Sequence, residues 1–95
     1  MSDIFISLVD DQKLFRSGLA SLIRSVAGFT LLSEAENGKI FIEQLEKADT
    51  LPHIALVDME MPEMNGVELN AVLQKKISFH KSVGFIYLQP GKYYR

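Results

Sequence analysis

The chain of 95 residues contains no cysteine, and this absence excludes several classes of protein at once. A disulfide framework, a zinc–thiolate site and a thiol nucleophile are all ruled out. The longest apolar runs have the length of strands and fall far short of the roughly 20 residues that span a membrane. The first residues carry no basic segment ahead of an apolar one, so we expect no signal peptide and a cytoplasmic location.

The composition is that of a folded domain with an unusual distribution of charge. Hydrophobic residues make up 47% of the chain and charged residues 23%, which excludes a disordered protein and predicts one domain. A net charge of −2 argues against nucleic-acid binding by the chain as a whole. All 12 acidic residues lie within 1–76, whereas 77–95 carry three basic residues and no acid. We therefore expect a single domain over 1–95 with an atypical tail at 77–95.

Apolar periodicity predicts strands and helices in alternation. Short runs rich in β-forming residues are typical of buried strands, and apolar residues repeating every three or four positions indicate helices with one apolar stripe. Gly28 is a plausible end for the first helix, and the pair Asn65 and Glu68 resembles a capping box at the start of the third. The expected strands cover 4–9, 29–35, 54–57 and 83–88, and the expected helices lie within 14–26, 40–48 and 65–76.

This alternation predicts a doubly wound α/β fold. Strands joined through helices by short links form a parallel sheet with right-handed crossovers and helices on both faces. In such folds the ligand site lies beyond the carboxyl ends of the strands. The residues that follow each expected strand are therefore the candidates for a ligand site.

Acidic residues follow two of the expected strands. Asp10 and Asp11 come directly after the first strand, and Asp58 comes directly after the third. If these strands are neighbours, three carboxylates meet at one edge of the sheet, where Mg²⁺ would relieve their mutual repulsion. A carboxylate beside such an ion can also attack phosphorus and form an aspartyl phosphate. The competing interpretation of Asp10 and Asp11 is a helix N-cap with no further role.

Two stretches of the sequence carry a family resemblance. The first is the run LVDDQKLFRSGL at 8–19, and the second is DMEMPEMNGVEL at 58–69, which contains the pattern D-x-x-M-P-x-M-N-G. Together they resemble receiver domains of two-component response regulators, in particular the subfamily usually joined to a helix-turn-helix DNA-binding domain. The resemblance covers residues 4–76 in order.

The resemblance implies a fold and a set of roles. The fold would be flavodoxin-like, with the strand order 2-1-3-4. Asp58 would accept a phosphoryl group from a histidine kinase or a phosphotransfer protein. Mg²⁺ would be the cofactor, held by Asp10, Asp11 and Asp58 and by the backbone carbonyl of Glu60. The chain would bind neither DNA nor a membrane directly and would not be an enzyme.

The resemblance stops after Lys76. No residue in the tail is a convincing counterpart of the family's switch Ser/Thr or of its lysine on a fifth strand. We therefore expect an incomplete receiver that lacks the fifth strand and the last helices, switches poorly, and associates with itself through an exposed edge or helix face. Two alternatives stay open: a degenerate receiver that binds proteins without phosphorylation, and a phosphatase, because Asp58-x-Glu60 superficially resembles a D-x-D nucleophile motif.

Overall fold

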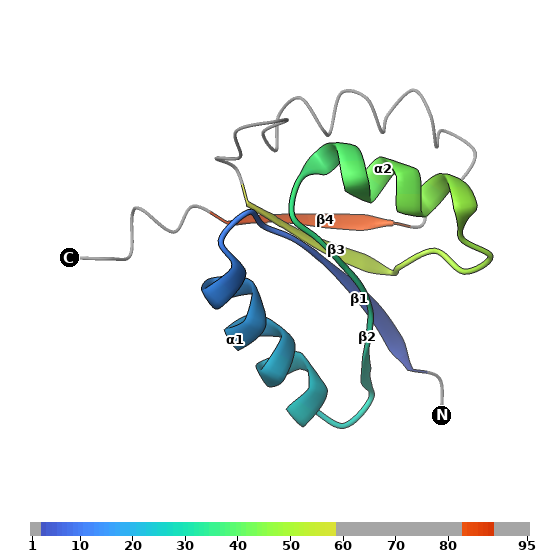
Figure 1. Ribbon diagram of the computed structural model, residues 1–95. Helices are drawn as coiled ribbons and strands as arrows, with labels where there is room; N and C mark the ends of the chain where they lie inside the picture. Colours follow the sequence, from blue (N-terminus) through green and yellow to red (C-terminus); the bar gives the residue numbers. More distant parts are fainter. Residues whose placement is uncertain (1–2, 59–82, 89–95) are drawn as a thin grey trace.

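The computed structural model describes residues 3–58 and 83–88 (Figure 1). The third helix expected within 65–76 and the loop that carries most of the motif at 58–69 lie outside the described residues. The strands are β1 (Ile4–Val9), β2 (Phe29–Ala35), β3 (Ile54–Asp58) and β4 (Gly84–Leu88), and the helices are α1 (Lys13–Ser25) and α2 (Gly38–Lys47).

The four strands form one parallel sheet with the order β2-β1-β3-β4, as predicted. β1 lies between β2 and β3, so the chain crosses from one side of β1 to the other after α2. The register aligns Val9 with Val57 and Asp58 with Leu88. The carboxyl ends of β1 and β3 therefore lie side by side, as the expected convergence of the three carboxylates requires.

Of the two described helices, one covers each face of the sheet (Figure 1). On the α2 face, Phe41, Ile42 and Leu45 pack against alternating residues of the strands, among them Val9 and Val57. On the α1 face, Ala20 and Ile23 pack against residues of the opposite parity, including Ile6 and Leu8. The central strands are apolar on both faces because both faces are covered, which explains why β1 and β3 appear as nearly continuous apolar runs.

Local signals fix the ends of the helices. Gly28 adopts φ 91°, a left-handed conformation that favours glycine, and it lies in the turn after α1. At the start of α2, the Asn37 side chain accepts a hydrogen bond of 2.8 Å from the backbone N–H of Ile40. This is N-capping by the residue type best suited to it. Asn37 thus caps a helix that begins two residues before the range 40–48 expected from the sequence.

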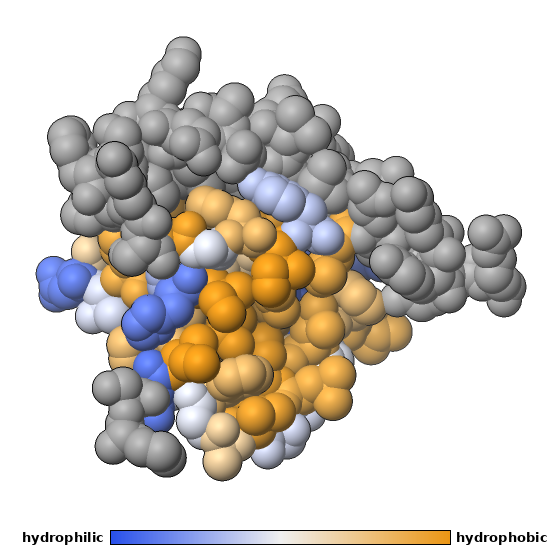
Figure 2. All heavy atoms as spheres, turned by 180° about the vertical axis from the view of Figure 1, so that it is seen from behind, coloured by the Kyte–Doolittle hydropathy of each residue, from blue (hydrophilic) through white to orange (hydrophobic). Residues whose placement is uncertain are grey.

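The described residues leave several large apolar side chains in contact with solvent. Figure 2 shows a broad apolar area on one side of the molecule. The most exposed of these side chains are Leu14 (89%) and Leu22 (64%) on α1, and Ile86 on β4 is 48% exposed. Neither of the two described helices is long and apolar enough to cross a membrane.

Candidate metal centre at the ends of β1 and β3

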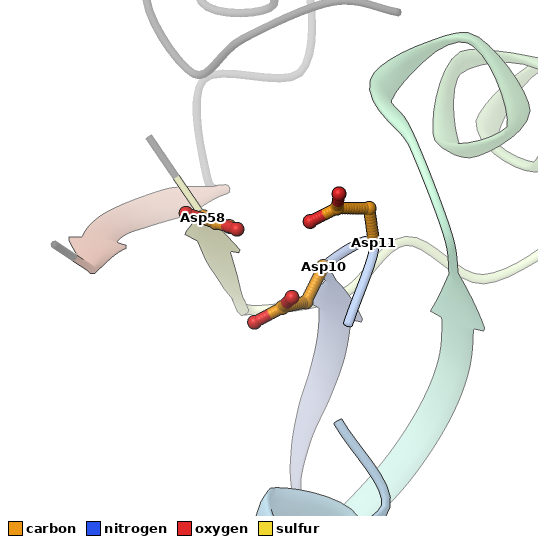
Figure 3. A group of neighbouring side chains, drawn as sticks. All are labelled: Asp10, Asp11 and Asp58. Atoms are coloured by element: carbon orange, nitrogen blue, oxygen red, sulfur yellow. The ribbon is translucent and has the colours of Figure 1, made fainter. Parts of the chain in front are cut away.

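The structure brings together three of the four residues that the sequence predicts as metal ligands. Asp10 and Asp11 follow β1, Asp58 ends β3, and the three side chains gather at one edge of the sheet (Figure 3). One carboxylate oxygen from each residue lies within 4.8 Å of the others. Asp10 and Asp58 are each only 2% exposed, whereas Asp11 is exposed. Glu60 lies outside the described residues, so its role stays a prediction.

Backbone pairing holds Asp10 in place and decides against the capping interpretation. The Asp10 N–H donates to the carbonyl of Ala35 at 3.0 Å, which extends the β1–β2 pairing by one residue. The Asp10 Oδ1 atom accepts a hydrogen bond of 2.8 Å from the N–H of Gln12, two residues on. Gln12, and neither aspartate, occupies the N-cap position of α1. Asp10 therefore closes a turn ahead of the helix, and its second carboxylate oxygen is left for another role.

Burial makes the charge on Asp10 costly. Loss of hydration raises the pKa of Asp10 above its usual 3.8, and the negative charge of Asp11 raises it further. The hydrogen bond from Gln12, the positive charge of Arg16 and hydrogen bonding with the Asp58 side chain act in the opposite direction, but the pKa stays raised. Without a cation, the site thus holds a buried carboxylate in an environment that disfavours its charged form.

Arg16 is a part of this site that the sequence did not indicate. Its guanidinium donates to the backbone carbonyl of Asp10 at 2.5 Å, and its Nε atom bonds Glu34 at 3.2 Å. These contacts tie α1 to the ends of β1 and β2. Arg16 lies one helical turn after Gln12, and the Arg16 N–H donates to the carbonyl of Gln12. This spacing can be read from the sequence, but the contact between Arg16 and Asp10 is seen only in the folded structure.

The donor set fits Mg²⁺. This ion prefers oxygen ligands and binds through one or two carboxylates while keeping several waters. The Oδ2 atom of Asp10 is buried and has no hydrogen-bond partner among the described residues. A buried carboxylate oxygen without a partner is costly, and a cation at this edge would remove that cost. The residues present therefore match the chemistry of a small, hard divalent ion.

The geometry agrees with what a comparison of sequences finds. The family model described as "Response regulator receiver domain" matches residues 6–86. This match covers most of the chain, so the chain belongs to the response regulator receiver family.

Several known proteins are similar to this chain. The chain is 39% identical over 74 residues to the nitrate/nitrite response regulator protein NarL of Escherichia coli strain K12, covering 77% of this chain and 33% of NarL. It is 34% identical over 76 residues to a protein-glutamate methylesterase/protein-glutamine glutaminase of Treponema denticola, covering 80% of this chain and 20% of that protein. A solved signal receiver domain of the NarL regulator from Mycobacterium tuberculosis superposes with a TM-score of 0.79 at 24% identity, covering 94% of this chain and 68% of that domain.

The extent of these matches limits what the relatives imply. The chain spans one third of the NarL protein and one fifth of the methylesterase. The enzymatic name of the latter therefore belongs to that whole protein, and the absence of enzymatic turnover in this chain stays a prediction. The likeness to the solved domain shows the fold, which is the receiver fold predicted from the sequence.

Proposed function

We propose that this chain accepts a phosphoryl group on Asp58 from a histidine kinase or a phosphotransfer protein, in a reaction that requires Mg²⁺. The observation that carries the proposal is the convergence of Asp10, Asp11 and Asp58 at the carboxyl ends of two adjacent parallel strands. Membership in the receiver family supports the same conclusion.

Two roles fall to the chain's own residues in this proposal: attack on the phosphoryl group and positioning of the attacking carboxylate and the metal. An oxygen of the Asp58 carboxylate attacks the donor's phosphorus, so that a P–O bond forms and the bond from phosphorus to the donor's imidazole nitrogen breaks. The donor's other ring nitrogen carries a proton, so the departing nitrogen keeps the electron pair of that bond and leaves as part of a neutral imidazole. Asp10 and Asp11 hold the Mg²⁺ ion with Asp58, and Arg16 positions Asp10 through its backbone carbonyl. When bound, Mg²⁺ supplies positive charge that offsets the charge of the transferring group.

We expect the acceptor chemistry to be more robust than the switching that follows it. The acidic residues needed for Mg²⁺ are present, but the sequence within 77–95 offers no convincing counterpart of the family's lysine, whose positive charge would add stabilisation near Asp58. It also offers no counterpart of the switch Ser/Thr that would respond to the phosphoryl group. Slow phosphorylation with a weak conformational response is therefore the expected behaviour.

The direct test is a measurement of intact mass after incubation with acetyl phosphate and Mg²⁺. We expect a single phosphoryl adduct on the wild-type chain, and none on Asp58→Asn or when EDTA removes the metal. Glu43→Gln, a change at an exposed position of α2, is a matched control and should form the adduct normally.

The outcomes separate the three functional hypotheses. An adduct that Asp58→Asn abolishes identifies a phospho-acceptor. The absence of any adduct on a chain that is folded by circular dichroism refutes this proposal and favours the degenerate protein-binding module. Continuous release of phosphate from acetyl phosphate or a generic phosphate ester, without a stable adduct, favours the phosphatase.

We also propose that the chain associates with a second copy of itself. Among the described residues, β4 is an edge strand of the sheet, and Ile86 on it is 48% exposed. Leu14 and Leu22 add exposed apolar surface on α1. Burying such surface against another copy would lower the free energy. A monodisperse monomer in light scattering with a sharp, cooperative melting transition would contradict this second proposal.

A further inference from the structure

A cavity of about 290 Å³ lies between β2, α2 and the segment that follows α2, away from the acidic site. Its wall is mainly apolar, with Leu32 from β2, Leu45 and Ala48 from α2 and its end, and Pro52 before β3. Four polar residues, Ser33, Gln44, Asp49 and Thr50, complete the lining. The volume is near the lower limit of about 300 Å³ for small-molecule pockets, and the mixture of an apolar wall with a few polar groups is typical of them.

An irregularity in β2 shapes this cavity. The pairing of β1 with β2 shifts between Ile6 and Ser7, so that Ile6 pairs with Leu31 while Ser7 pairs with Ser33. Leu32 is the extra residue of a bulge. Successive residues of a regular strand point to opposite faces, yet Leu32 and Ser33 both line this cavity. The bulge thus accounts for two neighbouring residues of β2 that line the same cavity.

Gln44 provides the cavity with an unused hydrogen-bond acceptor. Its Nε2 atom donates to the backbone carbonyl of Glu34 at 2.9 Å. This hydrogen bond places the nitrogen end of the side-chain amide against β2. The other end, Oε1, is buried and has no hydrogen-bond partner in the part of the chain that the structure describes. A buried acceptor without a donor is costly. Gln44 itself lines the cavity and the terminal torsion of glutamine is broad, so we infer that its amide can turn to present Oε1 to a bound donor.

Ser33 does not fill this need, because its hydroxyl is already engaged. The Oγ atoms of Ser7 and Ser33 lie 2.7 Å apart and form a hydrogen bond across the two strands. Asp49, which is exposed, lines the same cavity, and its negative charge disfavours an anion there. The chemistry of the cavity is therefore an apolar body, one unused acceptor, and a carboxylate that repels negative charge.

From these features we propose that the cavity is a binding site for a small, neutral, largely apolar molecule with one hydrogen-bond donor, which bonds the Oε1 atom of Gln44. An aromatic ring bearing an N–H or O–H group has this chemistry. The site is distinct from the acidic centre, because none of its lining residues belongs to that centre.

A pair of probes tests the donor without changing the protein. Indole has an aromatic body and one N–H, and 1-methylindole has the same body without the donor. We expect indole to shift the amide NMR signals of Leu32, Ser33 and Leu45 in the full chain. The highest probe concentration is 10 mM, which is about ten times the millimolar dissociation constant usual for so small a ligand. We expect 1-methylindole to bind about tenfold more weakly, the usual effect of one lost hydrogen bond.

Protein variants then assign the donor's partner. In Gln44→Leu we expect indole and 1-methylindole to bind equally, whereas the neighbouring Glu43→Gln should keep the tenfold difference. Ala48→Phe should fill the cavity and abolish the binding of both probes. Equal affinities of the two probes for the wild-type chain, no shifts at 10 mM, or shifts centred on Ile86 instead of the cavity would each overturn the proposal.

Discussion

Removing the charge of Asp10 should make the chain more stable and at the same time insensitive to Mg²⁺. The variant Asp10→Asn keeps the side-chain oxygen that accepts from the N–H of Gln12, so the turn before α1 can stay intact. It removes a carboxylate that is 2% exposed and lies within 4.8 Å of two others. The change therefore isolates the electrostatic cost of the site.

The structure sets the size of the effect. Two full charges 4.8 Å apart repel by about 3.5 kcal/mol at an effective dielectric constant of about 20. The positive charge of Arg16 offsets part of this repulsion, and partial protonation of Asp10, whose pKa is raised, removes more. We expect a net gain of about 1 kcal/mol in the free energy of unfolding without metal, or roughly 4–8 °C in melting temperature for a domain of this size.

The stability gained by Asp10→Asn should depend on pH, and the raised pKa of Asp10 determines the direction of that dependence. An aspartate whose pKa is raised in the folded state stabilises the protein below pH 3.8, and this contribution is lost as the pH rises through the raised pKa. The advantage of Asp10→Asn over the wild type should therefore be small near pH 3.5 and should grow towards pH 7.

The assay is thermal unfolding followed by circular dichroism, with and without Mg²⁺, for both chains across this pH range. Mg²⁺ should raise the melting temperature of the wild type, because a ligand that binds only the folded state stabilises it. It should have little effect on Asp10→Asn. A variant that is less stable than the wild type without metal, or one that Mg²⁺ stabilises equally, would refute the reasoning.

Three further predictions concern the fold and its surface. Asn37→Ala removes the cap of α2 and should lower the free energy of unfolding by about 1 kcal/mol in urea titrations, whereas Asn37→Asp should retain most of it. Phe41→Ala empties a fully buried position and should cost about 3–5 kcal/mol, so that a large part of the population is unfolded by circular dichroism; a loss below 1 kcal/mol would contradict its place in the core. Ile86→Lys should reduce self-association in light scattering without lowering the melting temperature, and unchanged association would exclude β4 from the contact.

The sequence predicted the fold well because its signals are local and strong. Apolar runs at β1 and β3 and the stripe of α1 predicted each element within a few residues of its observed bounds. The resemblance to receivers predicted the strand order, which no local pattern contains. The sequence also predicted that Asp10, Asp11 and Asp58 would converge, because acids at the ends of adjacent parallel strands must share an edge.

The parts that the sequence did not predict depend on contacts between distant residues. Arg16 seemed to be an ordinary polar residue on a helix, and its contact with Asp10 exists only because α1 packs across the end of β1. The bulge at Leu32 has no signal in its own segment, since the run 29–35 is an acceptable regular strand. The packing of α1 decides the first and the pairing of β2 with β1 decides the second, and neither is a property of one segment.

The placement of the acidic residues also bears on how the protein assembles. Asp10 and Asp58 are separated by 48 positions in the chain, and they meet only when β3 pairs with β1 after the crossover through β2 and α2. Such a parallel pairing between distant segments is intrinsically slow, because the loop entropy is lost before the contact is gained. Because the proposed Mg²⁺ site needs both carboxylates, we expect Mg²⁺ affinity to appear during refolding only when β3 pairs with β1 and the centre of the sheet closes.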